Sequence, residues 1–165
     1  MSRSKHILFV CTGNTCRSPM AEAIFRQMAM GANCPWRIGS AGTYAANGAW
    51  ATQEAREVMQ DLGLNIDGHR SRQLSEDILA DVDLVLTMTE NHKNMIKGEF
   101  PHLAHRVFTV KEFSGQGEDP NIGDPFGYGV DTYRQVAKEL QEYLALVFDE
   151  LQAKNCRGLS SQQKG

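Results

Sequence analysis

Residues 6–25 read HILFVCTGNTCRSPMAEAIF, and this stretch decides the fold class. The short apolar run that ends at Cys11 is typical of a buried strand. Turn residues follow it directly, and a helix is expected to begin near Arg17–Pro19, because proline suits the first helical turn. Helical spacing is then kept by the apolar residues Met20, Ala21, Ile24, Phe25 and Met28. A strand, a tight loop and a helix in this order are the first unit of a parallel α/β sheet.

The rest of the chain repeats this alternation of short apolar runs with helical patterns. Further elements are predicted at residues 36–40, 52–62, 84–88, 90–96 and 106–110, with a long helix from about residue 131. Residues 115–129 hold five glycines and two prolines, which predicts a long loop of the kind that is often functional. We therefore expect an α/β fold: a single domain with a four-stranded parallel sheet, helices on both faces and a phosphate-binding loop after the first strand.

Composition narrows the functional classes. The chain has 165 residues, of which 41% are hydrophobic and 22% charged, as in an ordinary globular domain. The formal net charge is -3 without a basic run, which argues against a nucleic-acid partner. No apolar run is long enough for a membrane span, and the polar residues 1–6 do not resemble a signal peptide, so we expect a cytoplasmic protein. The four cysteines and five histidines lack zinc-site spacing, so neither a metal nor an organic cofactor is predicted.

The loop between the first strand and the first helix has the features of a phosphate nest. Unpaired N–H groups at a helix N-terminus bind anions. Gly13 allows tight winding with unusual backbone angles, and Arg17 can clamp two phosphate oxygens. The expected phosphate-binding residues are Thr12, Gly13, Asn14, Thr15, Cys16, Arg17 and Ser18. Cys11 is expected at the bottom of the nest, where the helix dipole and Arg17 favour its thiolate and Ser18 can donate a hydrogen bond to it.

The spacing favours a catalytic cysteine over a structural one. A lone cysteine after a strand is usually a small buried hydrophobe, but a strand followed by C-x5-R-S and a helix is much rarer. We therefore predict that Cys11 attacks phosphorus inside an anion cage. The glycine and lysine spacing of a Walker nucleotide loop is missing, which excludes nucleotide hydrolysis by that route.

The leaving group needs a proton, and the candidate acid is Asp124 in the long loop. Pro125 stiffens the backbone beside it, and Phe126 and Tyr128 can form an apolar wall that favours the protonated carboxyl group. An ordinary Asp-Pro turn is the alternative reading, and Asp119 is a competitor because it also precedes a proline.

Four segments together resemble the low-molecular-weight protein-tyrosine-phosphatase family, and the match runs across nearly the whole chain. They are residues 10–22, 40–42, 83–89 and 124–127. The resemblance implies that Cys11 is the nucleophile, Arg17 the phosphate clamp and Asp124 the general acid. It also implies a supporting hydrogen-bond network of Asn14, Ser18, Ser40 and His69. We assign residues 1–157 to the phosphatase domain and residues 158–165 to a polar C-terminal tail.

One position distinguishes the branches of this family. Tyrosine-directed members usually carry isoleucine where this chain has Thr15, and the Thr-Gly-Asn-Thr loop is similar to the bacterial protein-arginine-phosphatase branch. The related arsenate reductases need two further cysteines near the middle of the chain, but residues 35–155 contain none. Thr15, Phe126 and Tyr128 are therefore expected to form the substrate wall of a phosphoprotein phosphatase.

The predicted reaction is hydrolysis of a protein phospho-residue through a phosphocysteine intermediate, with phosphoarginine favoured and phosphotyrosine as the alternative. A phosphocarrier or phosphate-binding module is a further alternative, against which Asp124 argues, because a carrier needs no acid for a leaving group. The partner is a phosphorylated protein, and the oligomeric state is left open. Cys16 lies in the same loop as Cys11, so it is either the partner in a regulatory disulfide or a packed small residue.

Overall fold

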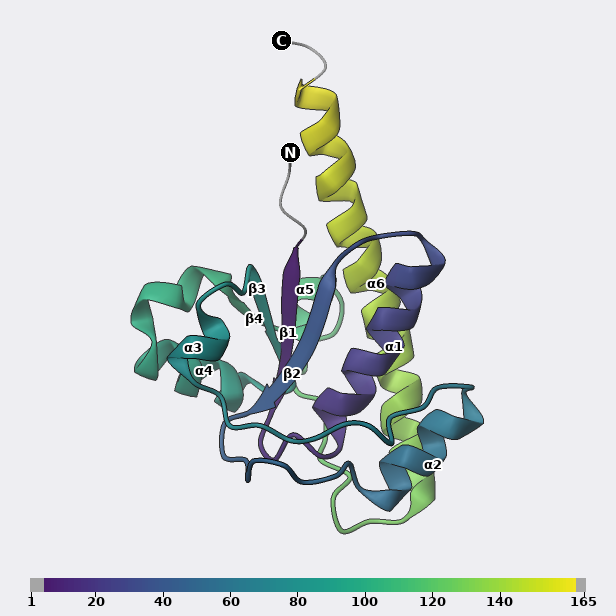
Figure 1. The fold of residues 1–165 in the computed structure, drawn as a ribbon. Coiled ribbons are helices and arrows are strands. Elements are labelled where there is room, and N and C mark those ends of the chain that lie inside the picture. Colours follow the sequence, from purple (N-terminus) through teal and green to yellow (C-terminus); the bar gives the residue numbers. More distant parts are fainter. Residues whose placement is uncertain (1–4, 163–165) are drawn as a thin grey trace.

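Four parallel strands form the centre of the protein. The structure is a computed structural model, which describes the backbone of residues 5–162 and the side chains of residues 5–154. The strands are β1 (His6–Cys11), β2 (Arg37–Gly42), β3 (Leu84–Thr87) and β4 (Val107–Thr109). Their order in the sheet is β2-β1-β3-β4, and every neighbouring pair is parallel (Figure 1). The expected four-stranded parallel sheet is confirmed.

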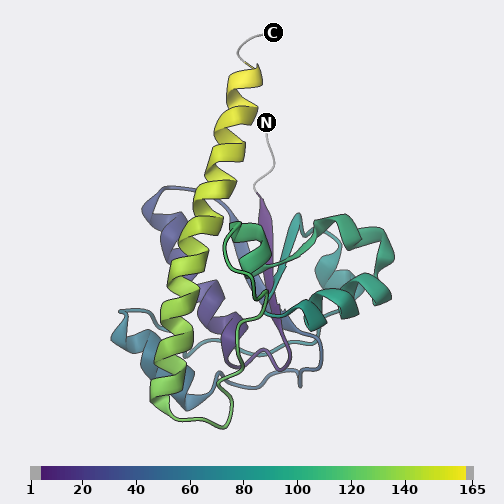
Figure 2. The ribbon, with the colours of Figure 1, turned by 180° about the vertical axis from the view of Figure 1, so that it is seen from behind.

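Helices cover both faces of this sheet. They are α1 (Arg17–Gly31), α2 (Gln53–Asp61), α3 (Glu76–Leu79), α4 (Glu90–Glu99), the 3-10 helix η1 (Pro101–Arg106), α5 (Val110–Ser114) and α6 (Val130–Gln162). Figures 1 and 2 show α1, α2 and α6 on one face, with α3 and α4 on the opposite face. The long helix α6 packs beside α1 and continues past the N-terminal ends of the strands.

The alternation of side chains along β1 explains why the strand is apolar throughout. Ile7 and Phe9 face the cluster shared with α1, α2 and α6, whereas Leu8 and Val10 face the cluster shared with α3 and α4. All four are fully buried. A shift of β1 by one residue would exchange the two sets of side chains, so packing on both faces fixes its register. Cys11 therefore has a defined position at the carboxyl end of the central strand.

The predicted elements differ from the observed ones mainly in short segments. The helices α3, η1 and α5 were not predicted, because each has only four to six residues and too few turns to show a period. The fourth strand ends at Thr109 instead of residue 110, because the Thr109 side chain accepts a hydrogen bond from the Glu112 N–H and caps α5. The second strand begins at Arg37 and pairs with β1 as far as Gly42.

The C-terminal helix is longer than predicted. It continues to Gln162 and so includes residues 158–162 of the predicted polar tail, while residues 163–165 lie outside the described residues. The domain boundary at residue 157 stays a prediction. Among residues 5–162, no helix combines the length and the apolar character that a membrane span requires.

Candidate active site

The segment from Cys11 to Ser18 wraps around the sulfur of Cys11. Cys11 ends β1 and is 2% exposed. Its Sγ lies 2.9 Å from the Ser18 Oγ and accepts a hydrogen bond from the Asn14 N–H at 3.3 Å. The carbonyl groups of Cys11, Thr12 and Thr15 accept backbone hydrogen bonds from residues 43, 44 and 52, outside the loop. Carbonyl groups paired on the outside of a turn, with N–H groups toward the inside, are what an anion nest requires.

The unusual backbone angle of this loop belongs to Asn14 and not to Gly13. Asn14 has φ of 58°, in the left-handed region that asparagine tolerates better than most residues. Gly13 is not in that region, so the expectation that it supplies the strained angle is wrong. The glycine that the loop does require is Gly42, at the end of β2. A Cβ atom there would collide with the carbonyl oxygen of Thr12.

The four residues of the predicted supporting network lie together. The Asn14 Nδ2 donates to Ser18 Oγ at 2.8 Å and to Ser40 Oγ at 2.9 Å, and the His69 Nε2 lies 2.7 Å from the Asn14 carbonyl oxygen. Ser18 accepts from Asn14, which leaves its own hydroxyl proton available for donation to the sulfur of Cys11. The network thus aims a hydrogen-bond donor at the residue predicted as the nucleophile.

Two members of this network were not predicted. Ser40 donates to the Glu22 Oε1 at 2.7 Å, and the backbone N–H of Arg72 donates to the Asn14 Oδ1 at 3.0 Å. Together these bonds fix which end of the Asn14 amide is the donor. Glu22 sits within the quoted motif, but nothing in the sequence near Arg72 indicates that its backbone N–H reaches a loop 58 residues away.

Arg17 joins the phosphate loop to the long loop of residues 115–129. Its side chain is nearly fully buried, and its Nη1 donates to the carbonyl oxygen of Ile122 at 2.9 Å. Its Nη2 lies 3.6 Å from the Asp124 Oδ2. The predicted phosphate clamp and the predicted acid are therefore adjacent, although they are more than 100 residues apart in the sequence.

A cavity of about 280 Å³ lies over the loop. Its lining includes Cys11, Thr12, Gly13, Thr15, Cys16, Arg17, Asp124 and Phe126 from the predicted site, together with Ala46 and Ala49. Of the predicted substrate wall, Thr15 and Phe126 line this cavity. Tyr128 is not among the lining residues. Ala46 and Ala49 carry no chemical signal by which the sequence could have marked them.

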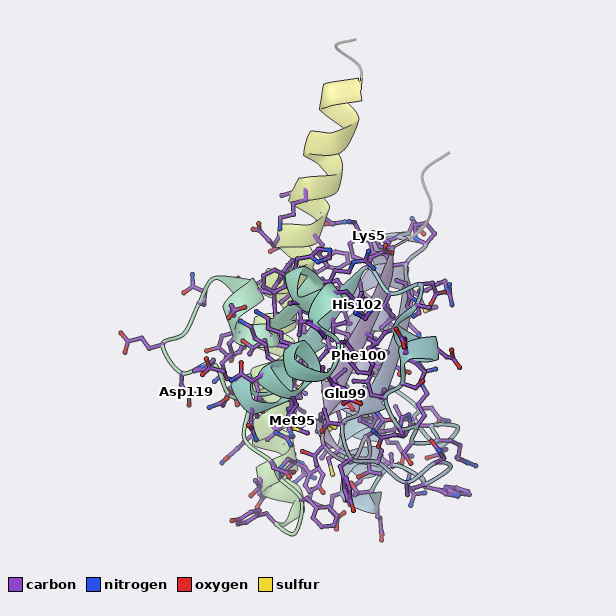
Figure 3. All side chains as sticks on the ribbon, turned by 90° about the vertical axis from the view of Figure 1, so that its left-hand side faces the viewer. Lys5, Met95, Glu99, Phe100, His102 and Asp119 are labelled. Carbon is purple, nitrogen blue, oxygen red and sulfur yellow. The ribbon has the colours of Figure 1, made fainter. Side chains whose placement is uncertain are left out.

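The two candidate acids occupy different places. The Asp124 Oδ1 accepts a hydrogen bond from the Phe126 N–H at 3.0 Å, and its side chain is 52% exposed at the cavity. Asp119 is not among the lining residues, and Figure 3 shows it at the edge of the molecule where the loop projects outward. The geometry thus favours Asp124 over Asp119.

A second and more polar cavity, of about 610 Å³, adjoins the first. The two share Thr12, Arg17 and Asp124. Its wall includes His92, whose pKa is lowered to about 4, chiefly by burial and then by the positive charge of Arg17, while Asp124 opposes the shift. Sequence reasoning did not select His92, which stood among five scattered histidines.

Cys16 is a buried residue of the loop, and its Sγ lies 3.2 Å from the Tyr133 hydroxyl oxygen. Burial raises the pKa of the Cys16 thiol, and hydrogen bonds from Tyr133, Thr52 and Thr15 offset part of the shift. A raised pKa disfavours the thiolate that would attack an oxidised Cys11. The disulfide between Cys11 and Cys16 stays a prediction.

Comparison with known proteins identifies the family of this chain. A family model described as low molecular weight phosphotyrosine protein phosphatase matches residues 6–157. A protein-arginine-phosphatase of Bacillus subtilis is 40% identical over 145 residues, covering 88% of this chain and 95% of that protein. The low molecular weight protein-tyrosine-phosphatase PtpB of Staphylococcus haemolyticus is 39% identical over 134 residues, covering 81% of this chain and 91% of that protein. The solved structure of the YwlE arginine phosphatase from Geobacillus stearothermophilus superposes with a TM-score of 0.86 at 38% identity, covering 93% of this chain and 96% of that one. This chain belongs to the low molecular weight phosphotyrosine protein phosphatase family.

Proposed function

We propose that this protein is a cysteine-dependent protein phosphatase that hydrolyses phosphoarginine through a phosphocysteine intermediate. The observation that carries the proposal is the environment of the Cys11 sulfur. It accepts the Asn14 N–H, lies 2.9 Å from the Ser18 hydroxyl and shares one cavity with Arg17 and Asp124. These groups stabilise a thiolate and bind a dianion in front of it.

In the first step, the Cys11 thiolate attacks phosphorus. A new S–P bond forms while the bond to the leaving nitrogen or oxygen breaks, and Asp124 gives its proton to the leaving atom. Arg17 and the N–H groups of the loop stabilise the negative charge on the three equatorial oxygens.

In the second step, water hydrolyses the phosphocysteine. Asp124 is now a carboxylate and takes a proton from the attacking water, so the same residue acts first as acid and then as base. The P–S bond breaks, and its electron pair returns to Cys11 as a thiolate. The chain's own residues supply every group in this scheme; the predicted absence of metal and cofactor, like the cytoplasmic location, stays a prediction.

The arginine preference rests on Thr15 and on the relatives. Thr15 lines the cavity and is half-buried, so its hydroxyl can accept a hydrogen bond from a guanidinium, which carries several N–H donors. Phe126 lies at the same cavity and can stack on the planar group. Protein-arginine-phosphatases are among the relatives that match most of the chain. Tyrosine phosphatases are also among them, so phosphotyrosine is the second candidate.

Matched peptides that carry phosphoarginine or phosphotyrosine at the same position test the proposal. We expect repeated turnover on both and a higher kcat/KM on phosphoarginine. A higher kcat/KM on phosphotyrosine would reverse the substrate assignment. A single phosphoryl transfer to Cys11 without further turnover would instead support the phosphocarrier.

A further inference from the structure

We propose that Thr12, oriented by His92, positions the water that hydrolyses the phosphocysteine. Neither residue was selected for such a role by the sequence, since Thr12 was expected only as part of the phosphate loop. The inference rests on the proposed two-step phosphatase and concerns its second step alone.

His92 is held in one orientation by hydrogen bonds on both ring nitrogens. It is 4% exposed. Its Nδ1 accepts the backbone N–H of Thr89 at 3.2 Å, and its Nε2 lies 2.8 Å from the Thr12 Oγ1. A backbone N–H can only donate, so Nδ1 carries the lone pair and the proton of the neutral ring is on Nε2. The Nε2–H therefore donates to the Thr12 hydroxyl oxygen.

The protonation state supports this direction. Since burial and Arg17 lower the pKa of His92 to about 4, the ring is neutral at neutral pH and one of its nitrogens remains an acceptor. An imidazolium would carry a proton on Nδ1 as well, directed against the Thr89 N–H.

Thr12 lies at the border of the two cavities, next to the cysteine that would carry the phosphoryl group. It follows Cys11 directly, it is exposed, and it lines both cavities together with Arg17 and Asp124. The second cavity reaches Asp124 along a polar wall that includes Asn94 and Asn121, so water has a route to the acid beside the cavity that holds the substrate. Apart from Ile122 and Gly123, the residues that line this cavity have side chains that can form hydrogen bonds, as a path for water requires.

The hydroxyl oxygen of Thr12 has a second lone pair for that water. With one lone pair engaged by His92, the other can accept one proton of the water while Asp124 accepts the other proton. The lone pair of the water oxygen then points at phosphorus. On attack, a P–O bond forms and the P–S bond breaks, one proton passes to Asp124, and the second stays on the phosphate product. Thr12 takes no proton in this step and acts by position alone.

The hydrogen bonds within α4 do not account for this arrangement. Thr89 and His92 cap the helix reciprocally, since the Thr89 side chain accepts the His92 N–H and the His92 ring accepts the Thr89 N–H. This cap explains the Nδ1 contact. It leaves unexplained why Nε2 is directed at a residue 80 positions away, on the loop that holds the reacting sulfur.

Burst kinetics with 4-nitrophenyl phosphate test the proposal, using Thr12→Val, which removes the hydroxyl and leaves the helix cap intact. We expect a nitrophenol burst approaching one per enzyme, a kcat lowered roughly tenfold and a kcat/KM unchanged within about twofold. Acid quench should show that phosphocysteine accumulates, because only its hydrolysis is slowed.

Variants of His92 test whether this residue acts through Thr12. His92→Ala should lower kcat in the same way, and the double variant with Thr12→Val should show little further loss, because the two residues act as one unit. His92→Gln should recover most of the loss, since its Oε1 can accept from Thr89 and its Nε2 can donate to Thr12. His102→Ala is the matched control, because His102, labelled in Figure 3, is on η1 with its side chain 59% exposed.

Two sets of results distinguish the water-positioning role of Thr12 from the phosphatase mechanism on which it depends. If Thr12→Val lowers kcat and kcat/KM equally without a build-up of phosphocysteine, or changes neither, the water-positioning role is wrong. If the unmodified enzyme forms no phosphocysteine at all, the proposed phosphatase mechanism itself is wrong.

Discussion

The two loops that meet at the cavity are built in opposite ways. In the phosphate loop, Asn14 and Ser18 are fully buried and linked to each other and to Ser40. In the loop of residues 115–129, Ile122 and Pro125 are the buried residues, while Asp124 and Phe126 are exposed. The comparison teaches that the predicted nucleophile and anion site are fixed by an internal hydrogen-bond network, whereas the predicted acid lies on a loop open to solvent. Substitutions in the two loops should therefore affect activity in different ways.

The largest expected effect comes from the buried loop. Cys11→Ser should lower steady-state turnover by more than about a thousandfold, because a hydroxyl group is a far weaker nucleophile than a thiol. The fold should persist, since oxygen is the smaller atom in the same place. Steady-state rates and thermal unfolding of the variant measure both points. Turnover at a tenth of the parent rate would contradict the nucleophile assignment.

The exposed loop should show a loss that depends on the leaving group. Asp124→Asn should lower the rate by about a hundredfold or more on a phenyl phosphate, and much less on a substrate whose leaving group departs without a proton. Asp119→Asn is the matched control, because it changes the same residue type on the same loop away from the cavity. Equal losses on both substrates, or from both variants, would exclude Asp124 as the acid.

His92, on α4, should make the free energy of unfolding depend on pH. Burial, and then the charge of Arg17, lower the pKa of His92 in the folded protein to about 4, from an ordinary value of 6.5. Above pH 6.5 the ring is neutral in both states. As the pH falls from about 6.5 to 4, the unfolded chain takes up a proton that the folded protein does not, so folding free energy is lost, by at most about 3 kcal/mol. Asp124 acts in the opposite direction and raises the pKa of His92.

Urea unfolding at several pH values measures this dependence. His92→Gln should flatten the loss between pH 6.5 and 4 relative to the parent, while His102→Gln should leave it in place. The same slope in the parent and in His92→Gln would show that His92 does not have the depressed pKa.

The smallest effect is expected at Thr15, which lines the cavity together with Phe126 of the other loop. Thr15→Ile should shift the ratio of kcat/KM values toward phosphotyrosine by roughly tenfold, because isoleucine removes the acceptor and adds apolar surface. Both specificity constants must be measured on matched peptides. An unchanged ratio would remove the main structural support for the arginine preference.

The buried loop was predictable from the sequence and the exposed one only in part. The apolar run before Cys11, the turn residues and the helical spacing after Pro19 are local signals, so β1, the loop and the start of α1 were predicted within a residue. The role of Asn14 in taking the left-handed angle was missed, because Gly13 beside it is the more permissive residue. Tyr128 is predicted at the substrate wall but is not among the residues that line the cavity, since proximity in sequence to Phe126 does not show where a loop side chain points.

Contacts between segments that are distant in the sequence could not be predicted from local sequence patterns. The pairing of His92 with Thr12 joins residues 80 positions apart, and the bond of Arg72 to Asn14 spans 58. Both depend on how β3 and the segment before α3 lie against the carboxyl end of β1. Family resemblance supplied Ser40 and His69, whose side chains carry no signal of their own in the sequence.

The anchoring of Ile122 has a consequence for how such enzymes diverge. Its N–H donates to the carbonyl of Met88, the residue directly after β3, and its own carbonyl accepts from Arg17, so one fully buried residue joins the loop of the predicted acid to the end of β3 and to the predicted phosphate clamp. We expect insertions or replacements on either side of this residue to keep those two hydrogen bonds, because both involve its own backbone. Related proteins can therefore differ in the loop residues around the cavity entrance, and so in the phosphorylated side chain that they accept, while the residues proposed to carry out the reaction keep their positions.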